Sequence, residues 1–215
     1  MKRRDFSLAL ASTAGALAGI PAAYAQATNF NEGSDFLALE KRAPVETAPG
    51  KVEVLEFFGY FCPHCNAFEP KLEAWTKVLP KDVVLRRVPV GFRPELAPQQ
   101  SLFYTLEAMG KIEEMHKKVF YAIHVEKQAL NNPANIGDWA QKQGLDRSKF
   151  DEVFKSFSVA TKVRKANQLQ DMYKVEGVPS LGIAGRFYTS GDLAQNMDRA
   201  LQVTDYLIGQ VRQGR

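Results

Sequence analysis

Short apolar runs and helix-spaced apolar positions follow one another along this chain and outline its predicted elements. Residues 52–58 form a nearly continuous apolar run, which is typical of a strand buried on both faces, and residues 83–90 form a second run. Between them a helix is predicted from Pro63 to about residue 78, because proline suits the first helical position. The runs 179–184 and 187–189 are separated by Gly185-Arg186, which predicts a β-hairpin, and a final helix is predicted over about 193–211.

The middle of the chain, residues 94–158, has apolar positions at helical spacing throughout, which predicts a bundle of helices. Its aromatic residues are expected to build a helical core rather than to hold a cofactor: Phe103, Phe120, Trp139, Phe150, Phe154 and Phe157. The order of elements therefore predicts an α/β domain divided by a helical insertion. The expected boundaries are 26–93 for the first part of the α/β domain, 94–158 for the insertion and 159–215 for the second part.

The first 25 residues are expected to be a signal peptide that is removed. Lys2, Arg3 and Arg4 precede a short apolar segment, and Ala23-Tyr24-Ala25 is a cleavage pattern, with a second possible cut after Ala27. The apolar segment is too short and too interrupted for a membrane anchor. Arg3-Arg4 also partly matches a twin-arginine signal, so both export routes stay open. We therefore expect an exported protein that is soluble after cleavage.

Charge gives no reason to expect nucleic acid or a membrane surface as partner. Removal of the signal peptide takes away three basic residues and Asp5, which lowers the formal net charge from +4 to +2. The chain has 45% hydrophobic and 24% charged residues, which is ordinary for a globular protein with a core.

Candidate chemistry is concentrated in Cys62-Pro63-His64-Cys65, at the start of the predicted helix. Two cysteines so close in sequence close almost no loop, so a bond between them has little structural value. At a helix N-terminus the free backbone N–H groups stabilise a thiolate, which favours Cys62 as the nucleophile and the more shielded Cys65 as its partner. A strand, a CxxC helix and a second strand are the first half of a thioredoxin-like unit.

His64 and Glu56 are predicted to assist this pair. An imidazole at position 64 favours the Cys62 thiolate, hence the reduced form, and so indicates an oxidising disulfide. Glu56 lies on an apolar face of its strand, where we interpret it as a proton acceptor near Cys65; the alternative is a carboxylate that reaches water. His116 and His124 are expected to be surface or packing residues.

Val178 and Pro179 precede the third apolar run and are predicted to face the cysteines. A cis bond between them would leave backbone polar groups free for an extended substrate, whereas the simpler alternative is a proline that starts a strand.

Metal sites are disfavoured, because structural zinc needs four ligands and the chain has two Cys and three His in total. Haem attachment would need a histidine where Asn66 stands.

With these segments in place, the chain resembles the DsbA family, the periplasmic disulfide oxidases of Gram-negative bacteria. The resemblance rests on Val54–Phe58, Phe61–Cys65 and Gly177–Pro179, in that order, and covers nearly the whole mature chain. It implies a thioredoxin-like fold with an inserted α-helical domain, a Cys62 thiol of unusually low pKa and no cofactor beyond the Cys62–Cys65 disulfide. It also implies a monomer that oxidises unfolded exported proteins through a mixed disulfide and is reoxidised by a DsbB-type quinone-linked membrane partner.

Three rival functions fit the sequence less well. Isomerases and reductases of this kind resemble dimers with a separate dimerisation domain, for which there is no room before residue 50. A peptide-binding, chaperone-like module would be favoured by serine or alanine at either cysteine. Glutathione-transferase relatives of the same architecture lack the second cysteine.

Overall fold

The computed structural model describes residues 30–214, so the predicted signal peptide 1–25 lies outside the described residues. The sheet has the strand order β1-β5-β4-β2-β3. Its strands are β1 (Leu37–Ala38), β2 (Val52–Phe58), β3 (Val83–Pro89), β4 (Ser180–Ile183) and β5 (Phe187–Ser190). β2 runs parallel to β3 and antiparallel to β4, and the remaining pairs are antiparallel. All seven residues of β2 are buried, as expected for a strand covered on both faces.

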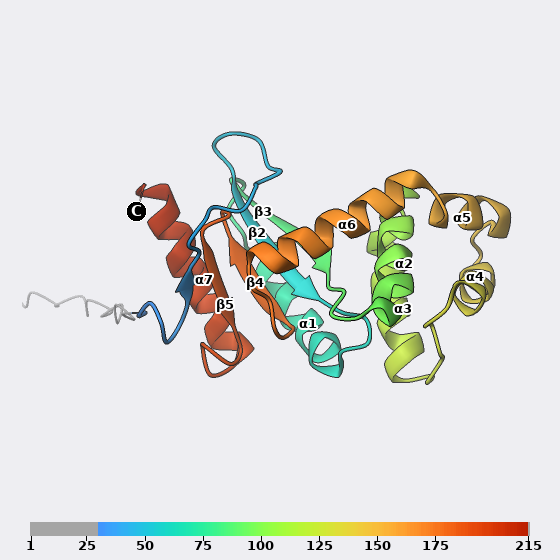
Figure 1. Cartoon of the computed structure of the whole chain (residues 1–215). Helices are drawn as coiled ribbons and strands as arrows, with labels where there is room; N and C mark the ends of the chain where they lie inside the picture. Colours follow the sequence, from blue (N-terminus) through green and yellow to red (C-terminus); the bar gives the residue numbers. More distant parts are fainter. Residues whose placement is uncertain (1–29, 215) are drawn as a thin grey trace, which may run out of the picture.

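The helices divide into those that cover the sheet and those that form the insertion (Figure 1). α1 (Pro63–Lys77) and α7 (Met197–Arg212) pack on one face of the sheet. A short 3₁₀ turn (Pro94–Leu96) leads into the insertion, which contains α2 (Ala97–Ala108), α3 (Ile112–His124), α4 (Pro133–Lys142) and α5 (Arg147–Phe154). α6 (Phe157–Met172) runs from the insertion back to the sheet, so the expected boundary at 158 falls inside its first turn.

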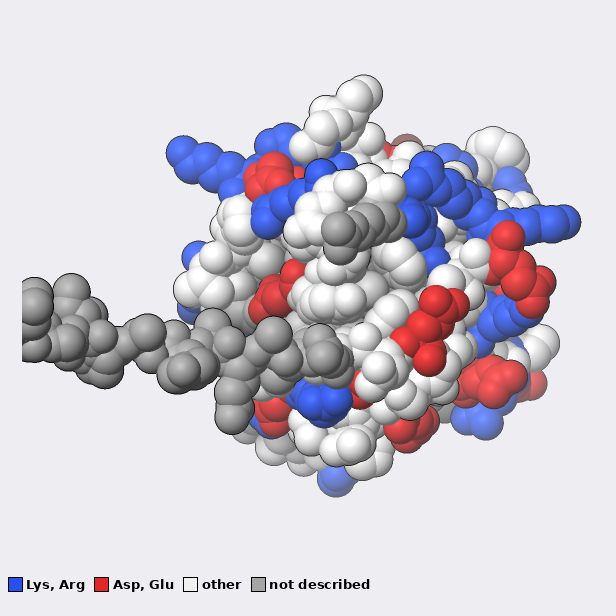
Figure 2. Space-filling model, turned by 90° about the vertical axis from the view of Figure 1, so that its left-hand side faces the viewer, with Lys and Arg blue, Asp and Glu red and all other residues white. Residues whose placement is uncertain are grey.

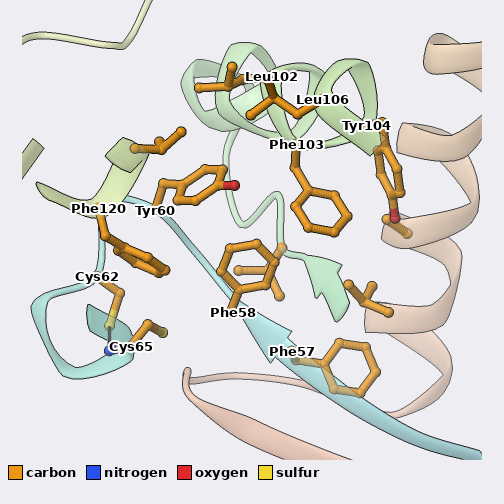
Figure 3. Packing of buried hydrophobic residues seen from close by; sticks show 14 of the residues in the cluster. Phe57, Phe58, Tyr60, Cys62, Cys65, Leu102, Phe103, Tyr104, Leu106 and Phe120 are labelled. Carbon is orange, nitrogen blue, oxygen red and sulfur yellow. Dashed lines mark hydrogen bonds between the residues drawn. The ribbon is translucent and has the colours of Figure 1, made fainter. Parts of the chain in front are cut away.

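Two clusters of buried residues form the core. One lies between the sheet, α1 and α7 and includes Val54, Leu72 and Leu207. The other continues from the opposite face of the sheet into the insertion, from Phe57 to Trp139, and it also contains Cys62 and Cys65 (Figure 3). The two cysteines therefore lie at the junction of the α/β layers with the helical insertion.

Some sequence-based expectations need correction. Phe157 is 79% exposed and does not belong to the helical core, because it is the first residue of α6 and its ring lies under the guanidinium of Arg164. The last helix begins at Met197 rather than 193, where the side chain of Asn196 accepts a hydrogen bond from the backbone N–H of Arg199. β1 was not predicted, since two residues give no periodic signal.

The surface carries charges of both signs. Figure 2 shows the side of the molecule near α7, where Lys and Arg gather along one rim and Asp and Glu lie among neutral residues below it. Within residues 30–214, no helix is long and apolar enough to span a membrane. In the same part of the chain no three His, Cys, Asp or Glu side chains are grouped as metal ligands would be.

Candidate active site

Cys62 is the N-cap of α1, so its sulfur takes the place that a serine or aspartate oxygen usually has at a helix start. The Sγ atom accepts a hydrogen bond from the backbone N–H of Cys65 at 3.4 Å, drawn as the dashed line in Figure 3. Pro63 occupies the first helical position, where its missing N–H leaves no acceptor unsatisfied. Both cysteines are free thiols in this structure.

The two sulfurs differ strongly in acidity. A hydrogen bond from the Cys65 thiol contributes most to lowering the pKa of Cys62, to about 6, and backbone N–H groups of Cys65 and His64 add to it against the effect of burial. Burial, followed by the hydrogen bond to Cys62 and the charge of Cys62, raises the pKa of Cys65 far above its ordinary value. Cys62 retains 7% of its surface and Cys65 none. Cys62 is therefore the sulfur that ionises more readily.

His64 contributes to this asymmetry through its backbone as well as its ring. Its backbone N–H acts on the Cys62 thiolate more strongly than its side-chain charge does, although both lower the pKa of Cys62. The ring itself is exposed, and His64 lines a groove beside the cysteines.

The loop before β4 faces Cys62 from the other side. The Val178–Pro179 peptide bond is cis, and the backbone carbonyl oxygen of Val178 accepts a hydrogen bond from the Cys62 thiol at 3.3 Å. Together with His64, this loop lines a groove of about 360 Å³, whose other wall is formed by Ser190, Gly191, Asp192, Gln195, Asn196 and Met197. The groove brings backbone polar groups next to the reactive sulfur.

Glu56 is fully buried in β2, so the alternative of a carboxylate that reaches water does not apply. Among residues 30–214 its only close ionic partner is Arg87, with Nε 3.0 Å from the Glu56 Oε2 atom, and neither carboxylate oxygen has a well-aligned hydrogen bond there. Burial, and next the negative charge of Glu69, raise the pKa of Glu56 to about 8 despite Arg87. The charge of Glu56 in turn raises the pKa of Cys65, which places the two groups within electrostatic reach.

Sequence reasoning missed the polar residues that surround Glu56. Glu69 in α1 accepts hydrogen bonds from Arg87 in β3 and from His116 in α3. His116 is buried, which agrees with the packing alternative of its prediction and excludes the surface one. The Nε2–H group of His124 donates a hydrogen bond to the backbone carbonyl oxygen of Tyr60 at 2.8 Å, because a carbonyl oxygen can only accept. Two signals pointed to this network: Arg87 interrupts an apolar strand, and His116 lies one helical turn after Ile112, on the apolar face of its helix.

Comparisons with known proteins agree with this geometry. Residues 53–202 match the model of the DSBA-like thioredoxin domain, which also establishes the thioredoxin-like fold. The chain is 45% identical over 213 residues to the thiol:disulfide interchange protein DsbA of Bordetella pertussis, covering 99% of this chain and 100% of that protein. The protein of the same name from Pseudomonas aeruginosa is 36% identical over 197 residues, 92% of this chain and 93% of its own length. The crystal structure of Pseudomonas aeruginosa DsbA superposes with a TM-score of 0.82, at 36% identity, over 86% of this chain and 96% of that one.

Proposed function

Because this chain belongs to the DsbA family of thiol–disulfide oxidoreductases, we propose that it gives its Cys62–Cys65 disulfide to cysteine-containing proteins that have been exported and are still unfolded. The observation that carries the direction of transfer is the low pKa of Cys62, about 6. A stabilised thiolate stabilises the reduced enzyme, and a disulfide whose reduced form is stable is a strong oxidant.

The oxidation of a substrate takes two exchanges. A substrate thiolate attacks the Sγ atom of Cys62, the S–S bond breaks, and Cys65 leaves as a thiolate. Because the pKa of Cys65 is so high, this thiolate takes up a proton, and Glu56 is the donor. The second substrate thiolate then attacks the substrate sulfur of the mixed disulfide and releases Cys62 as a stable thiolate. The substrate has lost two electrons and the Cys62–Cys65 pair has gained them.

Glu56 suits this step because its pKa of about 8 keeps it protonated at neutral pH. This extends the sequence-based interpretation, in which Glu56 only accepts a proton. In the return reaction the Cys62 thiolate attacks a disulfide of a DsbB-type membrane partner, Cys65 passes its proton back to Glu56, and the Cys65 thiolate then releases the partner's sulfur. The two electrons pass to the partner and its quinone.

The groove beside Val178 and Pro179 is proposed to hold the substrate in an extended conformation. The carbonyl oxygen of Val178 lies 3.3 Å from the Cys62 sulfur and accepts a hydrogen bond from it only while the thiol is protonated, so it is available to a substrate N–H when the sulfur is in a disulfide. A backbone contact of this kind does not depend on the substrate's side chains, which suits an enzyme that acts on many proteins.

The proposal places the mature protein in the periplasm as a soluble monomer. It rests on the predicted signal peptide 1–25, on cleavage after Ala25 or Ala27, and on the boundaries 26–93, 94–158 and 159–215. The proposed cycle uses the redox-active Cys62–Cys65 disulfide and no bound cofactor.

Equilibration of the pure protein with defined ratios of reduced and oxidised glutathione tests the direction. We expect the cysteine pair to be half-reduced under clearly oxidising conditions, and the oxidised protein to form the disulfide of a two-cysteine peptide. Cys65→Ser should accumulate a mixed disulfide with the peptide, and Cys62→Ser should form none. A pair that stays oxidised until glutathione is almost fully reduced would indicate a reductase instead.

A further inference from the structure

His116 is a buried imidazole that the helical insertion contributes to the region beneath the cysteines. It lies in α3, is 5% exposed, and is enclosed by aromatic rings that include Phe58 and Phe120, each with its centroid 5.2 Å from the imidazole. A polar ring in such surroundings is stable only when both of its nitrogens have partners. The proposed reaction gives this histidine no role.

Both nitrogens of His116 do have partners, and these partners fix its tautomer. Nδ1 lies 2.8 Å from the hydroxyl oxygen of Tyr60, and Nε2 lies 3.0 Å from Oε1 of Glu69. Glu69 accepts a hydrogen bond from Arg87 on its other oxygen and so is ionised. The Nε2–H group therefore donates to Glu69, and Nδ1 accepts from the Tyr60 hydroxyl. Burial lowers the pKa of His116, which keeps the ring neutral.

The same contacts continue to Glu56. Arg87 binds Glu69 through Nη2 at 3.0 Å and lies against Glu56 through Nε at 3.0 Å, so two buried carboxylates share one guanidinium. An arginine stays charged and cannot pass a proton on. A single cation between two carboxylates favours one negative charge and one proton, and the better-solvated carboxylate keeps the charge.

We propose that His116 is a positioning residue for the redox pair: by donating to Glu69 it holds the negative charge there, and it thereby keeps the shared proton on Glu56, beside Cys65. The helical insertion thus acts on the chemistry of the cysteines as well as on their surroundings. The inference rests on the proposed role of Glu56 as the proton donor to Cys65.

Other charged groups near His116 do not replace it in this role. Glu73 of α1 pairs with Lys117 of α3 at the mouth of a cleft of about 110 Å³, which Glu113 also lines. These three side chains are at the surface end of the cleft, and the Glu73–Lys117 charges compensate each other. Glu69 is 4% exposed, and within the described residues its hydrogen-bond donors are His116 and Arg87. Loss of His116 therefore leaves Glu69 with Arg87 alone.

Replacement of His116 by leucine tests the proposal through the protonation of Glu56. Without its donor, Glu69 becomes more basic, and the pKa of Glu56 is expected to fall from about 8 by about one unit. Carbon-13 NMR of side-chain carboxyls in the reduced protein measures this shift, with Glu56→Gln identifying the resonance. At pH 7.5 the protonated fraction of Glu56 would fall about threefold, and the rate of the step that expels Cys65 with it.

Two matched variants separate this effect from a loss of packing. His116→Gln retains an amide donor for Glu69 and an acceptor for Tyr60, so it should restore the pKa of Glu56. Tyr60→Phe removes only the other hydrogen bond of the same imidazole, so it should lower stability without moving that pKa. Glu69→Gln removes the charge itself and should shift the pKa of Glu56 in the same direction as His116→Leu, which decides the matter if the leucine variant does not fold.

An unchanged pKa of Glu56 in folded His116→Leu or in Glu69→Gln would overturn the inference and leave the proposed function untouched. A shifted pKa without a slower expulsion of Cys65 would instead support the role of His116 and remove Glu56 as the proton donor. A reducing glutathione equilibrium of the parent protein would refute the proposed direction of transfer whatever these variants show.

Discussion

The sulfur of Cys62 has two roles that usually belong to different atoms in a protein. It is the hydrogen-bond acceptor that closes the first turn of α1, and in the proposed reaction it is also the atom that reacts. The acceptor role favours negative charge, because backbone N–H groups and the positive end of the helix point at it. The capping geometry thus adds to the hydrogen bond from the Cys65 thiol in lowering the pKa of Cys62, and both support the proposed oxidising character of the pair.

A consequence at this residue is that the reduced protein gains stability relative to the oxidised one as pH rises from about 6 to 9. The folded pKa of Cys62 is lowered to about 6 from an ordinary value of 9.0, so the unfolded reduced chain binds more protons in this window. The expected gain is about 1 kcal/mol per pH unit, allowing for solvent screening. Urea unfolding of both forms across this range measures it.

Reduced Cys62→Ser is the matched control, since serine also caps a helix but does not titrate there. The variant should show no corresponding rise relative to the reduced parent. A constant stability difference between the two redox forms from pH 6 to 9 would contradict a lowered thiol pKa. Glu56 is present in both forms, so the comparison isolates the sulfur.

His64→Ala should raise the pKa of Cys62 by up to about one unit and make the disulfide less oxidising by up to about tenfold in the glutathione equilibrium. The effect is limited because the backbone N–H of residue 64 remains and the ring charge is the smaller contribution. The ultraviolet absorbance of the thiolate during a pH titration gives the pKa. Lys71→Ala, which removes a positive charge from the exposed face of the same helix, should change neither quantity.

At the level of elements, Arg87 holds β3, β2 and α1 together through buried charge. It is the shared cation of Glu56 in β2 and Glu69 in α1. Replacement by methionine keeps the apolar stem and removes the charge, which leaves two buried carboxylates without a cation and should destabilise the protein by about 3–5 kcal/mol near pH 8.

The loss in Arg87→Met should be smaller at pH 5. Without the cation the pKa values of both carboxyl groups rise in the folded protein. A carboxyl group with a raised pKa makes the protein less stable as the pH increases toward that pKa. Thermal unfolding from pH 5 to 8 would show the difference, and the added change Glu56→Gln should restore part of the stability at pH 8. Equal losses at pH 5 and pH 8 would mean that the variant fails through packing alone.

The elements around the cysteines were predictable because each has a strong local signal. The apolar run of β2 and the proline at the start of α1 are strong local signals, and the structure has both elements at the expected residues. The hairpin is also present, although its connection has three residues, Ala184 to Arg186, rather than Gly185-Arg186 alone. The partners of Glu56 were not predictable in this way. Glu69, Arg87 and His116 come from three elements, and a single sequence does not show that their side chains meet. The prediction that Phe157 belongs to the helical core was wrong because helical spacing does not show where a helix begins, and Phe157 is the first residue of α6.

On the scale of the whole molecule, the sheet and the insertion share one buried cluster, which extends from Phe57 in β2 to Trp139 in α4. Because apolar packing is continuous between the α/β domain and the insertion, and α6 connects the two, we expect both to unfold as one unit. The inserted helices are therefore part of the stability of the redox site and not a separate module attached to it.

The two tryptophans of the chain provide the measurement. Trp75 lies in the cluster between the sheet, α1 and α7, and Trp139 lies in the insertion. Trp75→Phe and Trp139→Phe each leave one fluorescent reporter, and the urea midpoint of each variant should coincide with the midpoint from its own circular dichroism. Separate fluorescence and dichroism transitions within one variant would show that the insertion unfolds independently.

In the proposed cycle, the capping role of the Cys62 sulfur also favours the release of the substrate from the mixed disulfide. While Cys62 is bonded to a substrate, α1 lacks an anionic acceptor at its first turn, and the amide of Cys65 is held by a weaker partner. Expulsion of the substrate restores that acceptor. The proposed cycle therefore couples release of the oxidised substrate to recovery of the strongest N-cap acceptor of α1.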